Sequence, residues 1–171
     1  MLRNIFFAVV ALCGIITFDA CQVYADEPTD NALDVFEYLD DNDYDPKFDD
    51  DGDIIFKHGK GAFLVIFDEN DDDYYRLIYA NFWPLESEAE WVASLLAGHK
   101  TNLEMKAAKV IVPTKYKPDS KRIFDQPFVT IEAYYSSPSH FTRVIPQSIK
   151  AIEGAALKFG LTIREEMEED D

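Results

Sequence analysis

Cysteine is nearly absent from this chain of 171 residues, which holds only Cys13 and Cys21. Both lie in a segment where an apolar stretch, residues 5–18, follows a short positive end and precedes the small-residue site Val23-Tyr24-Ala25. This pattern is typical of a signal peptide. We therefore expect a signal peptide at 1–25 and an exported, periplasmic or secreted, mature chain. Without thiols, that chain has no disulfides, thiolate metal sites or cysteine nucleophiles.

Long apolar runs are also missing. The stretch at 5–18 is shorter than the roughly 20 residues of a membrane-spanning helix, so we expect no integral span in the mature chain. A second interpretation of the segment stays open. Phe18-Asp19-Ala20-Cys21 resembles a bacterial lipoprotein processing box, in which Cys21 would carry a lipid anchor, although Phe18 and Asp19 depart from that pattern.

Basic residues are few, because 16 Lys and Arg face 33 Asp and Glu and leave a formal net charge of -17. Such a surface repels phosphates, which argues against nucleic acid and anionic membrane as partners. Aromatic residues are plentiful, and a hydrophobic content of 47% excludes intrinsic disorder for the body of the chain. We expect one domain at 26–163 and an acidic, disordered tail at 164–171.

The apolar pattern predicts elements in the order α-β-β-β-α-β-β-α. Gly59-Lys60-Gly61 indicates a tight hairpin, and Ser87 with Glu90 forms a capping box before the second helix. These elements predict the α+β class, with one five-stranded antiparallel sheet and helices packed on it. The expected strands are 54–58, 62–67, 74–83, 107–113 and 127–135, and the expected helices are 29–41, 87–103 and 137–159.

Helical spacing also predicts which side chains the helices bury. The first helix would bury Leu33, Phe36 and Leu39. In the last helix, Pro146 predicts a kink or a restart, and Gly160 predicts the end. The second helix would bury Trp91, Leu95, Leu96, His99 and Leu103, with His99 as a packed, hydrogen-bonded histidine.

Three segments carry a resemblance to a known family: "GDIIF…G…FLVIFD", "YYRLIYANF" and "KAAKVIV". With the order of elements and a helix ending near Asn102, residues 29–160 resemble the YbjN-like domain family. This bacterial family is labelled a sensory transduction regulator, and its fold is similar to that of type III secretion chaperones. The resemblance implies helices packed on one antiparallel sheet, and it brings no catalytic residues. Members are often cytoplasmic, so the predicted leader departs from the family.

Motifs for catalysis are missing as well. The chain has neither G-x-S-x-G nor S-x-x-K, and its histidines, His58, His99 and His140, lack the spacing of a zinc site. Most carboxylates fall in Asp-rich loops, which are wet, whereas acid–base catalysis needs carboxylates in different environments. We therefore expect no enzyme.

Two acidic runs stand out, residues 40–53 with eight acids and residues 68–73 with five. Pro46 and Gly52 occupy positions where an EF-hand needs Gly and Glu, which excludes that motif. The predicted meander places both runs at one end of the sheet. They are either solvated loops that keep an exported protein soluble or a site for a divalent cation. The candidate calcium ligands are Asp49, Asp51, Asp53, Asp68, Asp71 and Asp73.

Residues 105–122 carry a local positive charge. This segment is either a solvated flank or a surface for an acidic protein partner, including the acidic end of a second copy in a homodimer. The candidate partner-binding residues are Lys106, Lys109, Lys115, Lys117, Lys121 and Arg122.

Three functions remain open from the sequence. The first is a non-enzymatic, exported protein-binding or adaptor domain with no cofactor. The alternative is an acidic inhibitor, of the immunity type, against a basic secreted toxin. The third is a small hydrolase.

Overall fold

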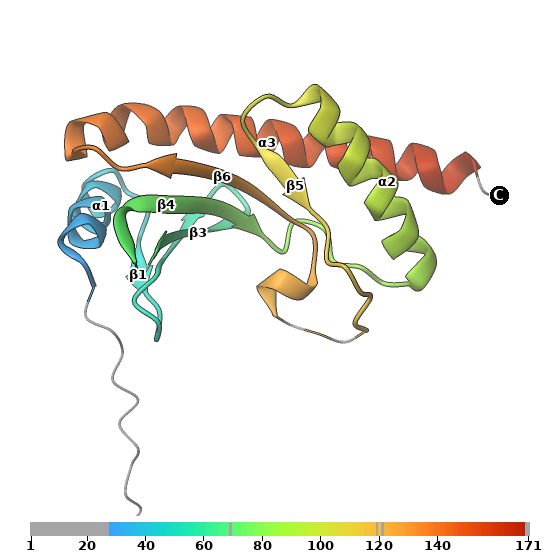
Figure 1. Cartoon of the computed structure of the whole chain (residues 1–171), viewed down its shortest axis with the longest axis horizontal. Helices are drawn as coiled ribbons and strands as arrows, with labels where there is room; N and C mark the ends of the chain where they lie inside the picture. The colour runs from blue at the N-terminus through green and yellow to red at the C-terminus, as the bar shows by residue number, and fades with distance from the viewer. Residues whose placement is uncertain (1–27, 69, 119, 121, 170–171) are drawn as a thin grey trace, which may run out of the picture.

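A computed structural model describes residues 28–68, 70–118, 120 and 122–169 (Figure 1). The predicted signal peptide at 1–25 and the alternative lipid site at Cys21 lie outside these residues. The elements are α1 (Asp30–Asp41), β1 (Lys47–Phe48), β2 (Ile54–His58), β3 (Gly61–Asp68), β4 (Asp71–Ala80), α2 (Glu88–Glu104), β5 (Lys109–Ile111), the 3-10 helix η1 (Ile123–Asp125), β6 (Phe128–Tyr134) and α3 (Pro138–Glu169).

The strands form one antiparallel sheet in the order β1-β2-β3-β4-β6-β5, which confirms the α+β class. The predicted count of five strands is wrong, because the described residues contain a sixth, β1, inside the first acidic run. β1 is only two residues long, and it pairs Phe48 with Ile54. Phe48 also stacks on Phe36 of α1, with ring centroids 4.6 Å apart. Tertiary burial of one aromatic ring therefore makes a strand where the local sequence predicts a loop.

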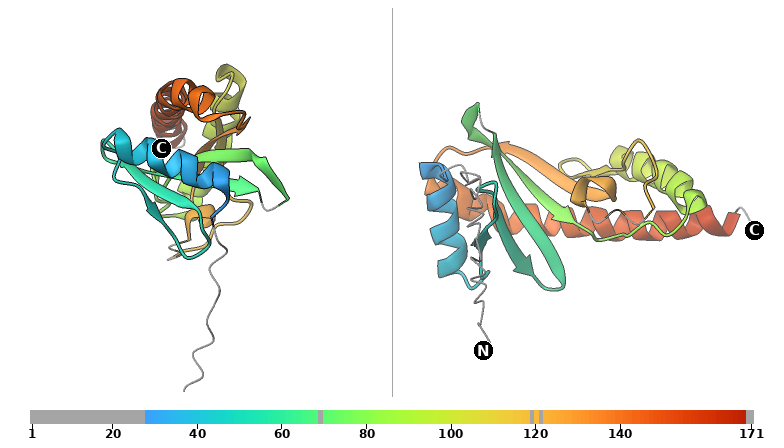
Figure 2. Two further views of the ribbon diagram at one scale, coloured as in Figure 1. Left: turned by 90° about the vertical axis from the view of Figure 1, so that its left-hand side faces the viewer. Right: turned by 90° about the horizontal axis from the view of Figure 1, so that it is seen from below.

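The sheet has two different faces. Its inner face carries the main core and lies under α1, α2 and α3, and Figure 1 shows α3 running along the whole molecule. On the outer face, Leu64 and Ile78 pack with Ile123 of η1 and with Phe128 at the start of β6. Figure 2 places α1 and α2 at opposite ends of α3. The domain therefore has an α1 end and an α2 end.

α1 begins where the sequence predicts, with the Thr29 hydroxyl accepting a hydrogen bond from the backbone N–H of Ala32 at 3.2 Å. It buries Ala32, Val35 and Leu39. Of the residues predicted to be buried, Leu39 is buried and Phe36 packs partly buried against the core, whereas Leu33 is 48% exposed.

α3 is continuous through Pro146, so the predicted restart is wrong. Proline has no N–H, and the carbonyl of Thr142 therefore loses its helical partner. The hydroxyl of Tyr38 in α1 donates to that carbonyl at 3.4 Å. A residue of another helix thus satisfies the acceptor that Pro146 leaves open.

The predicted end of α3 at Gly160 and the predicted tail at 164–171 are also corrected, because α3 continues to Glu169. Ile163 is fully buried, and Glu166 pairs with Lys100 of α2. These contacts hold the acidic stretch in the helix.

Candidate binding surfaces

α2 points its large apolar side chains to solvent and its small side chains to the core. Leu95, Leu96 and Leu103 are 39%, 51% and 75% exposed. The predicted buried side is therefore wrong, and His99 is exposed rather than packed. We call the outward row Val92, Leu95, Leu96, His99 and Leu103 the α2 stripe. The residues that α2 buries are Ala93, Ser94, Ala97, Gly98 and Thr101.

Close packing explains this orientation. A Cβ atom on Gly98 would lie 3.0 Å from Cγ2 of Val112, which follows β5. Only the helix side that carries small residues therefore fits against this strand. The side chain of Asn102 donates to the carbonyl of Val110 at 2.8 Å and accepts from its N–H at 2.7 Å. Trp91 Nε1 donates to the carbonyl of Pro113 at 2.8 Å. These bonds fix the rotation of α2 about its own axis.

A groove lies between α3 and the connection from β4 to α2. Phe82 and Trp83 form one wall with Tyr79, and the α3 face that includes Leu157 and Leu161 forms the other. The hollow has a volume of about 370 Å³. Leu157 and Leu161 are 67% and 50% exposed at its rim. We call it the Trp83 groove.

The aromatic wall is held in place from several sides. Asn81 adopts a φ of 52°, a left-handed conformation that costs energy for a residue other than glycine and turns the chain after β4. Trp83 Nε1 donates to a carboxylate oxygen of Glu90 at 2.8 Å. The rings of Phe82 and Trp83 meet the buried ring of Phe159 edge-on, at centroid distances of 5.4 and 5.9 Å. The wall is therefore preformed.

Glu90 also revises the predicted capping box of α2. Ser87 accepts from the N–H of Glu90 at 3.1 Å, as predicted. The carboxylate of Glu90 bonds Trp83 and, at 2.8 Å, the N–H of Glu86. The start of α2 and the groove wall thus share one carboxylate.

The two ends of the groove carry opposite charges. At one end, Glu153 lies 3.9 Å from His58. Burial raises the pKa of Tyr79, and the nearby negative charge of Glu153 raises it further. At the other end, the guanidinium of Arg164 lies over the ring of Trp83, 5.9 Å from its centroid.

The two acidic runs meet the sheet at the same end, as the sequence predicts, because β2 starts opposite the end of β3 in the register Ile54↔Val65. One oxygen of Asp49 accepts from the N–H groups of Asp51 and Asp53, at 3.0 and 2.9 Å. Burial, followed by the charges of Asp49 and Asp51, raises the pKa of Asp53 to about 6, and Arg76 opposes that rise. Negative charge at this loop is therefore incompletely compensated.

The other candidate calcium ligands accept hydrogen bonds from their own turns or from Asn31. Asp68 accepts from the N–H of Asn70 and Asp71 from that of Asp73, while Asp73 accepts from the side chain of Asn31. Among the described residues, no three His, Cys, Asp or Glu side chains are placed to share a metal ion. The structure thus supplies two acidic loops and no ligand set, and calcium remains a prediction.

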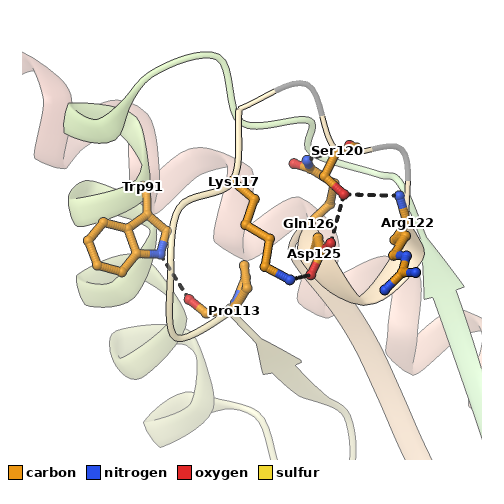
Figure 3. A network of polar contacts seen from close by, with 7 residues as sticks. All are labelled: Trp91, Pro113, Lys117, Ser120, Arg122, Asp125 and Gln126. Atoms are coloured by element: carbon orange, nitrogen blue, oxygen red, sulfur yellow. Dashed lines mark hydrogen bonds and ion pairs between the residues drawn. The ribbon is translucent and has the colours of Figure 1, made fainter.

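The candidate basic residues do not form one surface. Lys109 donates to the carbonyls of Asn102 and Met105 and so caps the end of α2, and Lys121 lies outside the described residues. Lys117 pairs with Asp125 at 2.5 Å, and the hydroxyl of Ser120 donates to the same carboxylate at 2.7 Å (Figure 3). These two bonds hold the pKa of Asp125 below its usual range. Lys117 is exposed although it is paired, and the other exposed candidates are Lys106, Lys115 and Arg122.

Gln126, also drawn in Figure 3, donates to the carbonyl of Ser120 at 3.2 Å. It also accepts from the N–H of Leu85, a residue that the figure does not draw, at 2.9 Å. The network attaches this segment to the residues before α2. Its polar groups therefore serve the fold.

A scan against protein-family models finds no match, and searches of curated proteins and of solved structures find no similar protein. The resemblance to the YbjN-like family therefore stays a prediction. Within the described part of the chain, no helix combines the length and the apolar character needed to cross a bilayer.

Proposed function

We propose that this chain is a non-enzymatic protein-binding or adaptor domain that acts outside the cytoplasm, and that the α2 stripe binds a helix of its partner. The observation that carries the proposal is the orientation of α2, which leaves Val92, Leu95, Leu96 and Leu103 between 39% and 75% exposed. Full burial of such a side chain contributes about 1.5–3 kcal/mol. Contiguous exposed apolar side chains of this kind mark interaction surfaces.

A helix fits this surface better than a loop does. The stripe follows α2 from Val92 to Leu103, a length of about 16 Å at 1.5 Å per residue. Helix pairs bury such narrow apolar rows by interlocking their side chains. The partner helix would carry its own apolar row, flanked by a basic residue near Glu88 and an acidic residue near Lys106, both of which are exposed here.

The test compares the wild-type chain with the double variant Leu95→Glu/Leu96→Glu. Both side chains are exposed, so the variant should fold, which circular dichroism can check. Ser136→Glu/Gln147→Glu adds the same charge at exposed positions of the α1 end and serves as the control. Wild type and control should capture a protein from an extracytoplasmic extract that the α2 variant does not. The purified pair should then bind with one defined stoichiometry.

Two outcomes would contradict this proposal. If all three chains capture the same proteins, the α2 stripe is not the binding surface. If light scattering shows that the wild-type chain alone is a dimer and the α2 variant a monomer, the stripe belongs to a second copy.

An acidic inhibitor of a basic protein is the second candidate, and the crowding of carboxylates at the α1 end favours it. Burial is the main cause of the raised pKa of Asp53, and the charges of Asp49 and Asp51 raise it further. If the chain is such an inhibitor, Asp49→Asn/Asp51→Asn should reduce capture of the basic partner, and Leu95→Glu/Leu96→Glu should not affect it. It would also weaken steeply with salt.

A further inference from the structure

The Trp83 groove is a second surface, and none of its lining residues belongs to the α2 stripe. Its floor depends on Gly160, because a Cβ atom there would lie 3.2 Å from Cζ3 of Trp83. The aromatic wall of the groove is preformed. The groove has a volume of about 370 Å³, which lies at the lower end of the range for ligand sites. The exposed leucines at the rim leave the groove open along α3. Such a groove suits a chain segment that lies along it better than a compact molecule that needs enclosure.

The charges at the ends set the length of the occupant. Glu153 and Arg164 are eleven positions apart on α3, which corresponds to about 16 Å along the helix. An extended chain advances about 3.3 Å per residue and points alternate side chains the same way. Residues i and i+4 are then about 13 Å apart, and long charged side chains can cover the remaining distance.

We propose that the Trp83 groove binds an extended peptide segment of a partner protein with three side chains facing it: a basic residue at Glu153, an apolar residue against Trp83 and Leu157, and an acidic residue at Arg164. The inference rests on the proposed protein-binding function and defines a second contact for the same kind of partner. A fatty acid fits less well, because it carries one anionic group and its apolar tail would meet Glu153.

The probe is the peptide acetyl-Lys-Thr-Leu-Thr-Glu-amide. Binding is followed by backbone amide shifts in NMR spectra of the mature chain, together with Trp83 fluorescence in a Trp91→Phe background. Shifts should saturate and cluster at Leu157, Gly160 and Leu161, and acetyl-Gln-Thr-Leu-Thr-Gln-amide should bind at least fivefold more weakly. Absence of saturable shifts at these amides would overturn the proposal, as would equal binding of the two peptides.

A change of one end should change the preferred peptide. Glu153→Lys makes both ends basic, and Glu153 is exposed enough to be replaced without loss of the fold. This variant should prefer acetyl-Glu-Thr-Leu-Thr-Glu-amide over the parent peptide by at least fivefold, in either direction of the peptide backbone. An unchanged preference would contradict the proposed contact at Glu153. Saturable binding of decanoate with no binding of either peptide would assign the groove to a lipid.

Two variants separate this inference from the proposed function. Leu161→Ser removes an exposed rim residue and should weaken the parent peptide about tenfold while the melting temperature stays close to that of the wild type. Leu95→Glu/Leu96→Glu should bind the peptide like the wild type. If partner capture depends on the α2 stripe and no peptide binds the groove, the proposed function stands and this inference fails.

Discussion

The two ends of this domain use apolar side chains in opposite ways. At the α1 end, Val35 and Leu39 pack inside, and the acidic residues of α1, such as Asp34 and Glu37, face solvent. At the α2 end, alanine, glycine and serine pack inside and leucines face solvent. Both helices show apolar residues at helical spacing, so spacing alone does not identify the buried side. A helix that must approach its neighbours closely buries its small residues, and its large ones then become a surface.

The largest expected effect comes from truncating one leucine in each helix. Leu39→Ala in α1 should lower the free energy of unfolding by about 3 kcal/mol, because the side chain is fully buried. Leu96→Ala in α2 should change it by less than about 0.5 kcal/mol. Urea unfolding measures both values. A large loss for Leu96→Ala would mean that α2 is rotated toward the core.

A smaller loss of stability should follow when a larger side chain is placed on the buried side of α2. Gly98→Val places a Cβ atom 3.0 Å from Val112 and should lower the free energy of unfolding by about 2 kcal/mol. Gly154→Val is the matched control, since Gly154 is an exposed helical glycine at which an added Cβ atom would lie 3.9 Å from Met105. Equal losses in thermal or urea melts would show that backbone propensity, rather than packing, sets the cost.

Charge at the α1 end should make stability depend on pH. The folded protein raises the pKa of Asp53 from 3.8 to about 6, so it binds this proton more tightly than the unfolded chain. The associated stability is present below about pH 4 and is lost as the pH rises through 6. Asp53→Asn should remove that loss and stabilise the protein at pH 7.5 by about 1 kcal/mol, after solvent screening reduces the full effect.

Asp50→Asn is the control for this prediction, because Asp50 is an exposed residue of the same loop and the substitution removes the same charge. Urea melts at pH 4.5 and 7.5 should show a difference for Asp53→Asn alone. If both variants respond alike, the general negative charge causes the pH dependence.

The smallest effect is expected from calcium. In the two acidic runs, Asp49, Asp68 and Asp71 accept hydrogen bonds within their own turns, Asp73 accepts from Asn31, and Asp45 pairs with Lys47. Among the described residues, no three such side chains converge. Calcium should therefore raise the melting temperature no more than magnesium does at matched ionic strength. A calcium-specific rise that Asp49→Asn/Asp51→Asn abolishes would establish the site that the sequence leaves open.

The hairpin between β2 and β3 shows what local sequence predicts well. Gly59, with a φ of 59°, takes the first position of a two-residue loop between His58 and Gly61, as the Gly-Lys-Gly motif indicates. β1 shows the opposite case, since two residues carry no periodicity and Phe48 of the strand stacks on Phe36 of the preceding helix.

The sequence predicts that a groove between helices and sheet could hold a partner, but it does not predict the residues of the Trp83 groove. Gly160 indicates a helix end when it is considered alone, whereas the structure uses it to admit the ring of Trp83. That use depends on Asn81, whose backbone conformation directs Trp83 toward α3. Local sequence patterns do not encode such a long-range contact, so the residues of the groove can be identified only from the structure.

The bond from Tyr38 to the carbonyl of Thr142 has a consequence for folding specificity. The backbone of an α-helix repeats at every turn, so the backbone alone does not mark where a second helix must pack. Pro146 breaks this equivalence by leaving one acceptor on α3 that only a correctly placed hydroxyl reaches. A shift of α1 by one turn would leave a polar group without its partner, at a cost of about 1–3 kcal/mol. Pro146 thus favours the observed position of α1 on α3 over positions shifted by one helical turn.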